Sequence, residues 1–429
     1  MKTGPSQQTG PRSAEERKLN VTCCIAGGGP AGMMLGFLLA RAGVDVVVLE
    51  KHSDFLRDFR GDTIHPSTLE VLDELNLLEE FLKLPHQKAY QLGANIGGVE
   101  FPFADFSHLP TQCKFVAFIP QWDFLNFLAR AASRYSGFNL RVRADATDLI
   151  EESGRVIGLR AQTPDGPLEI RAALVVAADG RSSILRDKAG LEVHDLGAPM
   201  DVLWFRLARK PDDPEQTMGR FAERQMLVMI SRGDYWQCGY LIPKGSIEGI
   251  RARGIEAFRA GIATIAPFLA DRVREFDDWN EVSLLTVRVD RLKKWYRPGL
   301  LCIGDAAHAM SPVGGVGINL AIQDAAAAAN LLAEALRTKQ LTTEHLANVQ
   351  RRREFPTRIT QRLQVVIQNR LISRVLGARG IVKPPLIIRL LARFPILRRI
   401  PARLVGIGIR PEHALTTAES KPDQATAHS

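Results

Sequence analysis

Residues 21–52, VTCCIAGGGPAGMMLGFLLARAGVDVVVLEKH, constrain the fold of this chain more than any other stretch. Residues 21–26 are a short apolar run that ends at glycine, as a buried parallel strand does. Pro30 suits the first turn of a helix, where its missing N–H has no partner to lose, and Gly43 suits the end of that helix. Residues 44–49 are a second apolar run. The stretch therefore predicts a strand, a glycine-rich turn, a helix and a second strand.

The glycine-rich turn has the spacing Gly27-x-Gly29-x-x-Gly32. The first glycine permits a tight turn, the second lets a pyrophosphate approach the main chain, and the third lets helix and strand pack closely. The helix N-terminus stabilises phosphate charge, and Glu50 can accept hydrogen bonds from a ribose. The pattern predicts a bound dinucleotide without distinguishing FAD from NAD. The predicted contacts in this stretch are Gly27, Gly29, Pro30, Ala31, Gly32, Glu50 and Lys51.

A second stretch of small residues, GDAAHAMSPVGGVGINLAIQDA at 304–325, follows an apolar run at 300–303. Asp305, at the end of that run, can hold a second ribose or a sugar-alcohol hydroxyl. Pro312 shapes the turn, and the three glycines after it leave room for a flat group to approach the main chain. An alanine-rich helix then begins, and its N-terminus favours negative charge. Together, the two stretches predict an extended flavin dinucleotide that is held at both ends.

Three motifs resemble the three fingerprints of the class A flavoprotein aromatic hydroxylases: GGGPAG at 27–32, VVAADGRSSILR at 175–186 and the stretch at 304–325. This is the para-hydroxybenzoate hydroxylase family, which includes the ubiquinone-biosynthesis hydroxylases. The motifs follow the family's order and its usual separations. The resemblance implies an α/β fold with a GR2-type Rossmann-like FAD-binding domain made from separate chain segments, an inserted antiparallel β-sheet substrate domain and a helical C-terminal segment.

The resemblance also implies roles for single residues. Beyond the first stretch, the implied cofactor contacts are Arg60, Gln121, Asp179, Gly180, Arg186, Gly304, Asp305, Gly315, Gly317, Ile318 and Asn319. Pro312 would lie beside the flavin near the reaction site. His308 is a second candidate for a catalytic role, although a histidine at a strand–helix junction is more often a packing or hydrogen-bonding residue.

The implied activity is that of an FAD-dependent NAD(P)H monooxygenase. It would hydroxylate an aromatic substrate, phenolic and either lipophilic or polycyclic, with O₂ through a flavin C4a-hydroperoxide. Such chemistry needs a dry cavity over the flavin. Two alternatives stay open: an FAD-dependent reductase or dehydrogenase of a polyprenyl-type lipid on the same scaffold, and a non-enzymatic flavin-binding redox protein. NADH and NADPH are equally compatible with the sequence.

The middle of the chain has the pattern of a sheet. Residues 199–211, 220–245 and 281–296 alternate or run apolar with turn signals between them, which predicts an antiparallel sheet of about seven strands. It resembles the family's substrate lobe. Candidates for an aromatic substrate pocket are Trp204, Met226, Trp236 and Tyr240. Because strand side chains alternate, about half of such candidates must face away from any one pocket.

The basic residues are concentrated near the C-terminus. Residues 351–410 hold 15 lysines and arginines and one acid, whereas the rest of the chain carries 41 bases and 46 acids. Within 357–376, a helical stripe with arginines opposite is formed by Ile359, Leu363, Val366, Ile367 and Leu371. Two interpretations stay open: a helical lid or interface on the body, and docking of 357–410 at an anionic membrane surface. The basic surplus alone does not indicate nucleic-acid binding.

With 429 residues, the chain is long enough for two packed lobes. The expected division is a disordered arm at 1–20, an FAD-binding domain at 21–90, 110–190 and 290–345, a substrate domain at 91–109 and 191–289, and a helical basic region with a disordered tail at 346–429. Five scattered cysteines without metal spacing indicate reduced core residues of a cytoplasmic protein. Residues 1–20 lack the apolar segment of a signal peptide, and no uncharged apolar run is long enough to predict a membrane span.

Overall fold

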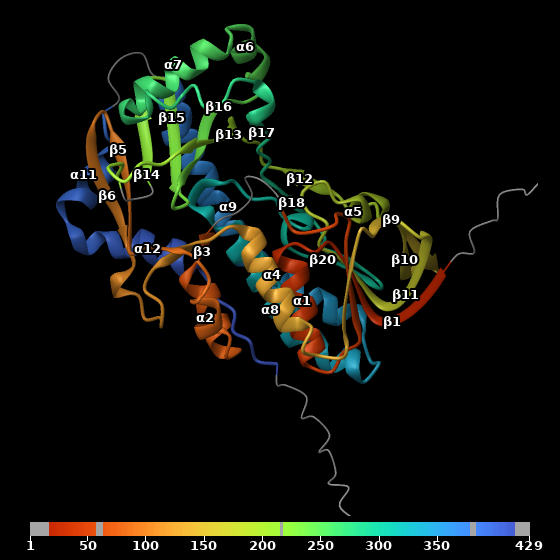
Figure 1. Cartoon of the computed structure of the whole chain (residues 1–429). Helices are drawn as coiled ribbons and strands as arrows, with labels where there is room; N and C mark the ends of the chain where they lie inside the picture. Colours follow the sequence, from red (N-terminus) through yellow and green to blue (C-terminus); the bar gives the residue numbers. More distant parts are fainter. Residues whose placement is uncertain (1–16, 57–62, 215–217, 378–382, 417–429) are drawn as a thin grey trace, which may run out of the picture.

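The computed structural model describes residues 17–56, 63–214, 218–377 and 383–416. Within them, the largest sheet has eight strands, with the main path β19-β20-β11-β1-β2-β8 and with β10 and β9 continuing from β11 (Figure 1). The strand bounds are β1 Arg17–Ala26, β2 Val46–Glu50, β8 Phe138–Val142, β9 Asp145–Glu152, β10 Arg155–Thr163, β11 Gly166–Ala177, β19 Tyr296–Arg297 and β20 Leu300–Cys302.

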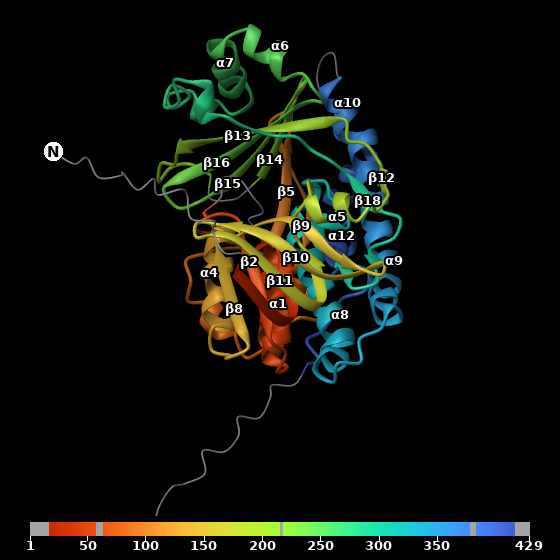
Figure 2. The same ribbon diagram turned by 90° about the vertical axis from the view of Figure 1, so that its right-hand side faces the viewer.

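The centre of this sheet is parallel and is buried on both faces. Strands β20, β11, β1, β2 and β8 pair in parallel. Cys23 and Ile25 of β1 face helices α1 (Pro30–Arg41), α4 (Gln121–Ala132) and α8 (Gly317–Arg337). Cys24 and Ala26 face β9 and β10. Burial on both faces explains why these strands are continuous apolar runs in the sequence. Figures 1 and 2 show the helices stacked against the sheet, with α1 and α8 side by side.

A second sheet, of seven strands, lies above the first in Figure 1. Its order is β17-β13-β16-β15-β14-β5-β6, and helices α6 (Ile247–Ala252) and α7 (Ile255–Ile265) lie on its outer side. The bounds are β5 Gln91–Ile96, β6 Val99–Asp105, β13 Met200–Ala208, β14 Met218–Ala222, β15 Gln225–Ser231, β16 Tyr235–Pro243 and β17 Ser283–Leu285. The pairs are antiparallel as expected except for β14–β5, which is parallel and joins strands from two distant chain segments.

Two small sheets and the remaining helices join these layers. The small sheets are β3 (Thr63–Ile64) with β7 (Val116–Phe118) and β4 (Gln87–Ala89), and β12 (Val193–Asp195) with β18 (Asp290–Leu292). The other α-helices are α2 Pro66–Glu74, α3 Leu78–Phe81, α5 Ile184–Lys188, α9 Thr343–Ile367, α10 Ser373–Leu376, α11 Leu386–Arg393 and α12 Arg399–Gly406. A π-helical turn, Gln368–Ile372, joins α9 to α10, and a 3₁₀ turn, Pro395–Arg398, joins α11 to α12.

Helix α9 turns two residues of its apolar stripe toward solvent and a row of glutamines toward the protein. Leu363 and Val366, from the predicted apolar stripe, are 41% and 47% exposed. The buried side carries glutamines, and Gln361, Gln364 and Gln368 are each at most 3% exposed. Polar side chains lie on the buried side because the segment beside α9, residues 309–313, has main-chain carbonyl groups that need donors. The glutamine side chains supply those donors.

Three further expectations can be compared with the structure. Residues 17–20 are not part of a disordered arm, because they extend β1 and pair with β11 from Arg17 onward. All five cysteines are buried and unpaired, as expected. Among the described residues, one helix, Val313–Arg337, is long and apolar enough to cross a membrane, and 83% of its apolar window is buried inside the protein. This helix contains α8 and forms part of the central core.

Candidate active site

Four parallel strands end side by side at one edge of the eight-stranded sheet. Ala26 of β1 pairs with Leu49 of β2 and with Ala177 of β11, and Ala177 pairs with Cys302 of β20. The residues that follow these strands therefore meet at the carboxyl edge, where open parallel sheets bind their ligands. All three sequence motifs reach this edge, although they lie far apart in the chain.

The first glycine turn, residues 27–32, is too crowded on its inner side for side chains. A Cβ atom on Gly27 would lie 2.3 Å from the carbonyl oxygen of Ala178, and one on Gly32 would lie 2.0 Å from the carbonyl oxygen of Gly27. A Cβ atom on Gly29 would meet nothing within 4 Å. Within the described chain, no side chain caps the N-terminus of α1. The turn therefore offers space and main-chain N–H groups to a phosphate.

Glu50 lies against this turn. Its Oε1 accepts a hydrogen bond from the main-chain N–H of His52 at 2.9 Å, and the residue is 9% exposed. A Cβ atom on Gly28 would lie 3.1 Å from Oε2, so the carboxylate borders the turn directly. This position suits a carboxylate that accepts hydrogen bonds from a ribose. Lys51, the next residue, is exposed.

Asp179 and Gly180 form the turn after β11. One oxygen of Asp179, Oδ2, accepts a hydrogen bond from the N–H of Leu185 at 3.3 Å. The other, Oδ1, is buried and has no partner among the described residues. Burial raises the pKa of this carboxyl. A buried oxygen without a partner is one that a donor from a ligand would satisfy. Gly180 has φ 87°, and a Cβ atom there would meet nothing within 4 Å.

Two arginines join the second motif to the third. Arg186 is 5% exposed, and its guanidinium donates to the carbonyl groups of Ala306 and Arg181 at 3.4 and 3.1 Å. Arg186 therefore acts on the protein's own main chain. Arg181, which lies outside the predicted set, donates to Oδ2 of Asp305 at 3.3 Å. Both side chains of this ion pair are about one third exposed, so the pair borders the carboxyl edge from the accessible side.

The second glycine turn, residues 304–317, comes close to the first. A Cβ atom on Gly304 would lie 3.0 Å from that of Ala31 and 3.5 Å from that of Ala321, so this glycine fits between α1 and α8. Pro312 is exposed within the turn. A Cβ atom on Gly317, at the start of α8, would meet nothing within 4 Å. The N-terminus of α8, like that of α1, has no side-chain cap within the described chain.

Residues from 63–68 hold the second glycine turn and the start of α8 in place. The carbonyl oxygen of Gly315 accepts a hydrogen bond from Oγ1 of Thr63 at 2.8 Å and lies 3.0 Å from Nε2 of His65. Oδ1 of Asn319 accepts hydrogen bonds from Ser67 and Thr68 at 2.7 and 2.8 Å, which fixes the orientation of this buried amide. Ile318, beside it, is buried.

His308 lies behind the second glycine turn. It is 1% exposed, its Nε2 lies 2.6 Å from Oδ2 of Asp324, and its ring packs on Trp295. Asp324 also accepts hydrogen bonds from the N–H of Gly304 at 3.1 Å and from Nε of Arg353 at 3.0 Å. Burial opposes the ionisation of Asp324, but the interactions with His308 and Arg353 outweigh it and lower its pKa. Nδ1, the other ring nitrogen of His308, is buried and has no hydrogen-bond partner among the described residues.

The buried glutamines of α9 complete the support of this turn. Nε2 of Gln364 donates to the carbonyl groups of Ser311 and Val313 at 2.9 and 2.8 Å, and its Oε1 accepts from the N–H of Ser311 at 3.2 Å. Gln361 donates to the carbonyl group of Ala309 at 3.1 Å. These residues were missed because the sequence signal, a polar residue every three or four positions in a basic helix, is also typical of an exposed face.

Two other predicted contacts stay predictions. Gln121 is the first residue of α4 and is 9% exposed, which places it at the end of a helix that packs beside α1. Arg60 lies outside the described residues.

The outer face of the seven-stranded sheet holds two of the four predicted pocket residues. Trp236 and Tyr240 pack with the side chains of α7. Nε1 of Trp236 donates to Oδ2 of Asp213 at 2.8 Å, and the ring of Tyr240 lies 5.3 Å from that of Phe258. Both side chains therefore belong to the core of this lobe. The four candidates therefore do not share one face of the sheet, which agrees with the expected alternation of strand side chains.

The inner face of the seven-stranded sheet holds the other two predicted pocket residues. Trp204 and Met226 belong to one apolar cluster with Val313 of the second glycine turn and with Ile372 and Leu376 beyond α9. The ring of Trp204 lies over Gly239, where a Cβ atom would approach it to 3.0 Å. The inner face of the seven-stranded sheet thus meets the loop that carries Pro312.

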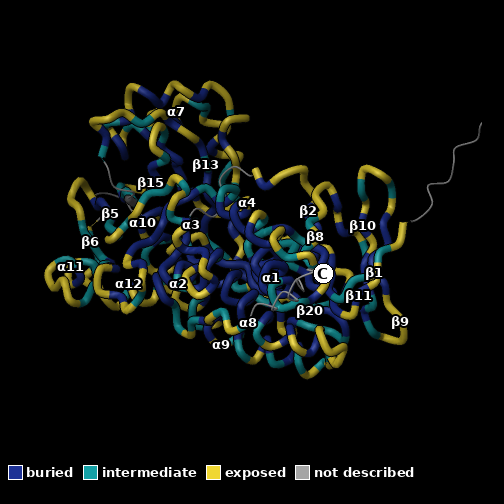
Figure 3. Tube along the Cα trace, turned by 60° about the horizontal axis from the view of Figure 1, so that its bottom comes forward, coloured by how far each residue is buried: buried dark blue, intermediate teal, exposed yellow. Residues whose placement is uncertain are grey.

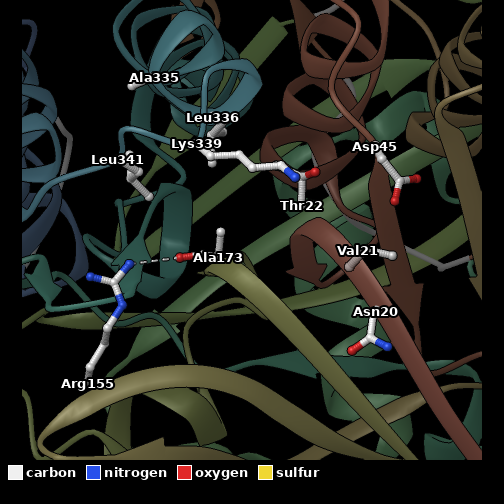
Figure 4. A pocket seen from close by; sticks show the side chains of 10 residues that line it. All are labelled: Asn20, Val21, Thr22, Asp45, Arg155, Ala173, Ala335, Leu336, Lys339 and Leu341. Atoms are coloured by element: carbon white, nitrogen blue, oxygen red, sulfur yellow. Dashed lines mark hydrogen bonds between the residues drawn. The ribbon is translucent and has the colours of Figure 1, made fainter.

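A separate surface hollow lies at the opposite edge of the eight-stranded sheet (Figure 4). It is lined near the beginnings of the parallel strands by Val21, Thr22 and Asp45, and from the helical side by Lys339. Arg155 donates to the carbonyl group of Ala173 at 3.2 Å there. This edge has none of the three motifs, so the hollow is distinct from the candidate site.

Comparison with known protein families gives one match to most of the chain. Residues 20–363 match the family described as "FAD binding domain". A relative from Streptomyces rimosus, 6-methylpretetramide 4-monooxygenase, is 32% identical over 383 residues, which cover 89% of this chain and 91% of the relative. Dialkyldecalin synthase from Streptomyces rugosporus is 28% identical over 316 residues, or 71% of this chain, but the match spans only 63% of that protein.

A solved structure has the same fold. The OxyS anhydrotetracycline hydroxylase from Streptomyces rimosus superposes with a TM-score of 0.71, at 24% sequence identity over 90% of this chain and 76% of that one.

Proposed function

The chain belongs to the FAD-binding-domain family and is an FAD-dependent aromatic monooxygenase, and we propose that it hydroxylates a polycyclic phenolic substrate with O₂ and NAD(P)H. The relative with 32% identity acts on a pretetramide, and its similarity extends over nearly the whole length of both chains. The comparisons do not support the alternatives of a polyprenyl reductase or a non-enzymatic redox protein.

One observation supports the proposal that this chain binds FAD between two helix N-termini. Two helix N-termini without side-chain caps start near one edge of the sheet, and the glycine at each, Gly29 or Gly317, has open space in place of a side chain. Gly304 fits between the two helices. Such an arrangement suits a long ligand with a pyrophosphate near one helix and an electron-rich ring near the other.

The residues at the carboxyl edge of the sheet would each bind a different part of FAD. Glu50 would accept the adenosine ribose hydroxyls, and main-chain N–H groups at Gly29 would bind the pyrophosphate. Asp305 would bind the ribityl or pyrophosphate region, held in place by Arg181. The N-terminus of α8 would stabilise negative charge on the pyrimidine edge of the ring. FAD held by these residues would supply the chemistry of hydride acceptance from NAD(P)H and of O₂ activation.

The chain's own residues would then position the substrate. Trp204 and Met226 lie on the face of the upper sheet that meets the second glycine turn, and their apolar side chains would exclude water above Pro312. We propose that His308 acts through Asp324, which accepts a hydrogen bond from Gly304, and does not touch the substrate.

We also propose the finer division of the chain into a GR2-type FAD-binding part and an inserted substrate part. The division is supported by the origin of the strands. Those of the seven-stranded sheet come from residues 91–105 and 200–285, and those of the eight-stranded sheet come from the segments before, between and after these.

The test is a direct assay of the purified protein. It should be yellow, and polycyclic phenols should accelerate the oxidation of NADH or NADPH together with O₂ uptake and yield a product heavier by one oxygen atom. Oxidation of NAD(P)H with a reduced product and without O₂ uptake would indicate a reductase. If the protein is yellow but NAD(P)H does not reduce its flavin in the presence of any candidate substrate, an oxygenase function is contradicted.

A further inference from the structure

Seven apolar side chains are exposed on the segment α11–α12, residues 386–406. They are between 38% and 70% exposed: Leu386, Ile387, Leu390, Phe394, Ile396, Ile400 and Leu404. We call them the α11–α12 surface. The segment lies at the margin of the molecule beside β6 (Figure 1), and Figure 3 shows exposed residues along it.

The helices that carry these exposed side chains also pack on the body of the protein with other residues. In α11, Leu391 is 9% exposed and Ile388 is partly buried in the cluster beside β5. In α12, Ala402 is fully buried, and a Cβ atom on Gly406 would lie 2.9 Å from Leu109. Each helix thus buries one side. Six of the exposed residues fall in two sets spaced by four positions, as along one side of a helix: Leu386, Leu390 and Phe394, and Ile396, Ile400 and Leu404.

The charge of the segment has one sign. Residues 383–410 contain one lysine, six arginines and no acid. Arg398 donates to the carbonyl groups of Leu391 and Ala392 at 2.8 and 2.7 Å, which fixes the turn between the two helices. The side chains of the arginines at 389, 393, 399 and 403 are exposed beside the apolar residues.

This composition fits one kind of partner. An apolar strip with adjacent arginines is the pattern of a helix that lies in the interface of an anionic membrane. A second copy of this chain would bring arginines against arginines, which is unfavourable. A purely polyanionic partner would leave the seven apolar side chains exposed to water.

We propose that the α11–α12 surface docks the protein on an anionic phospholipid bilayer. The buried side of α12 is linked to the second glycine turn, because the carbonyl oxygen of Val405 lies 2.8 Å from Nδ1 of His65 and that of Gly315 lies 3.0 Å from Nε2. Docking would hold the loop of Pro312 near the membrane surface. An apolar polycyclic substrate partitions into that surface, and this last point rests on the proposed function.

The test is co-sedimentation of the flavin-loaded full chain with vesicles of phosphatidylcholine, with and without phosphatidylglycerol. We expect binding only to the anionic vesicles and weaker binding as salt is added. The variant R393Q/R399Q should lower the partition coefficient roughly 25-fold, because each arginine near the surface contributes about fivefold. The variant I396S/I400S should abolish binding.

The controls replace one exposed arginine and one exposed apolar residue outside the α11–α12 surface. Arg274→Gln and Val142→Ser should bind vesicles like the parent protein. Flavin content and substrate-dependent NAD(P)H oxidation in solution should be unchanged in all four variants, which separates docking from the proposed function. The proposal is overturned if the parent binds neither vesicle, if the paired variants bind like the controls, or if light scattering shows a dimer that I396S/I400S dissociates.

Discussion

The two glycine turns reach the same edge of the sheet, but they are held there in different ways. The first turn relies on the main chain: the N–H of Gly27 donates to the carbonyl group of Leu49 at 2.8 Å, and that of Ala178 donates to Ala26 at 2.8 Å. Gly27 and Gly32 leave no room for a side chain there, whereas Gly29 faces open space. The second turn relies on buried side chains from distant segments, among them Asp324 and Gln364.

The second turn also depends on the C-terminal end of the described chain. Arg353 is fully buried, and it bonds Asp324 at 3.0 Å, Glu412 at 3.3 Å and the carbonyl group of Arg410 at 3.1 Å. Glu412 lies beyond the segment that matches the family. The comparison teaches that one end of the site is built by local geometry, whereas the other depends on a buried charge network that joins α8, α9 and residues 410–412.

The largest effect should come from removing the centre of this network. Arg353→Met leaves Asp324 and Glu412 buried without their shared cation, which should cost about 3–5 kcal/mol of unfolding free energy. Denaturant unfolding measures the cost, and flavin retention during gel filtration shows whether the second turn loosens.

The neighbouring arginine is the control. The side chain of Arg352 is 40% exposed and contacts the same Glu412 at 2.8 Å. Arg352→Met should therefore cost no more than about 1 kcal/mol. Equal losses in the two variants would show that the buried network does not distinguish the second turn.

This contrast also marks what the sequence could predict. Residues 27–32 and Glu50 were predictable because their pattern expresses rules that act within one strand, turn and helix. Arg353 and Gln364 were not, because an arginine or glutamine in a basic helix usually faces water. Only the position of segments 304–313 and 410–412 in space turns them inward. Trp236 and Tyr240 illustrate a related limit, since alternation predicts two faces without saying which one meets the cofactor.

The first turn should respond to glycine replacements in two distinct ways. Gly32→Ala places a Cβ atom 2.0 Å from a main-chain oxygen, and such overpacking should cost about 3 kcal/mol. Gly29→Ala meets no protein atom within 4 Å, so stability without flavin should change little while flavin affinity falls. Thermal unfolding of the apoprotein and titration with FAD separate the two. A Gly29→Ala protein that binds FAD normally would remove the pyrophosphate from this position.

The glutamine support of the second turn should be nearly as important. Gln364→Met removes the donor for the carbonyl groups of Ser311 and Val313, and leaving them unsatisfied should cost about 2–3 kcal/mol. Leu363→Gln, on the exposed side of the same helix turn, should change stability by less than about 0.5 kcal/mol. A larger loss of unfolding free energy from Leu363→Gln than from Gln364→Met would contradict the assignment of the glutamine side of α9 as its buried side.

Acid should loosen the second turn before the first, because a histidine holds only the second. Burial lowers the pKa of His65 to about 4, against the two carbonyl groups of Val405 and Gly315, which favour its charged form. The unfolded chain takes up this proton near pH 6.5, so the stability that neutral His65 contributes is present above that pH and is lost as the pH falls toward 4. At pH 5 the loss should be about 2 kcal/mol relative to neutral pH.

His65→Gln cannot titrate, so its melting temperature should fall less steeply between pH 6.5 and 4 than that of the parent. Parallel curves would mean that the second turn does not depend on the neutral form of His65, and that its sensitivity to acid arises elsewhere.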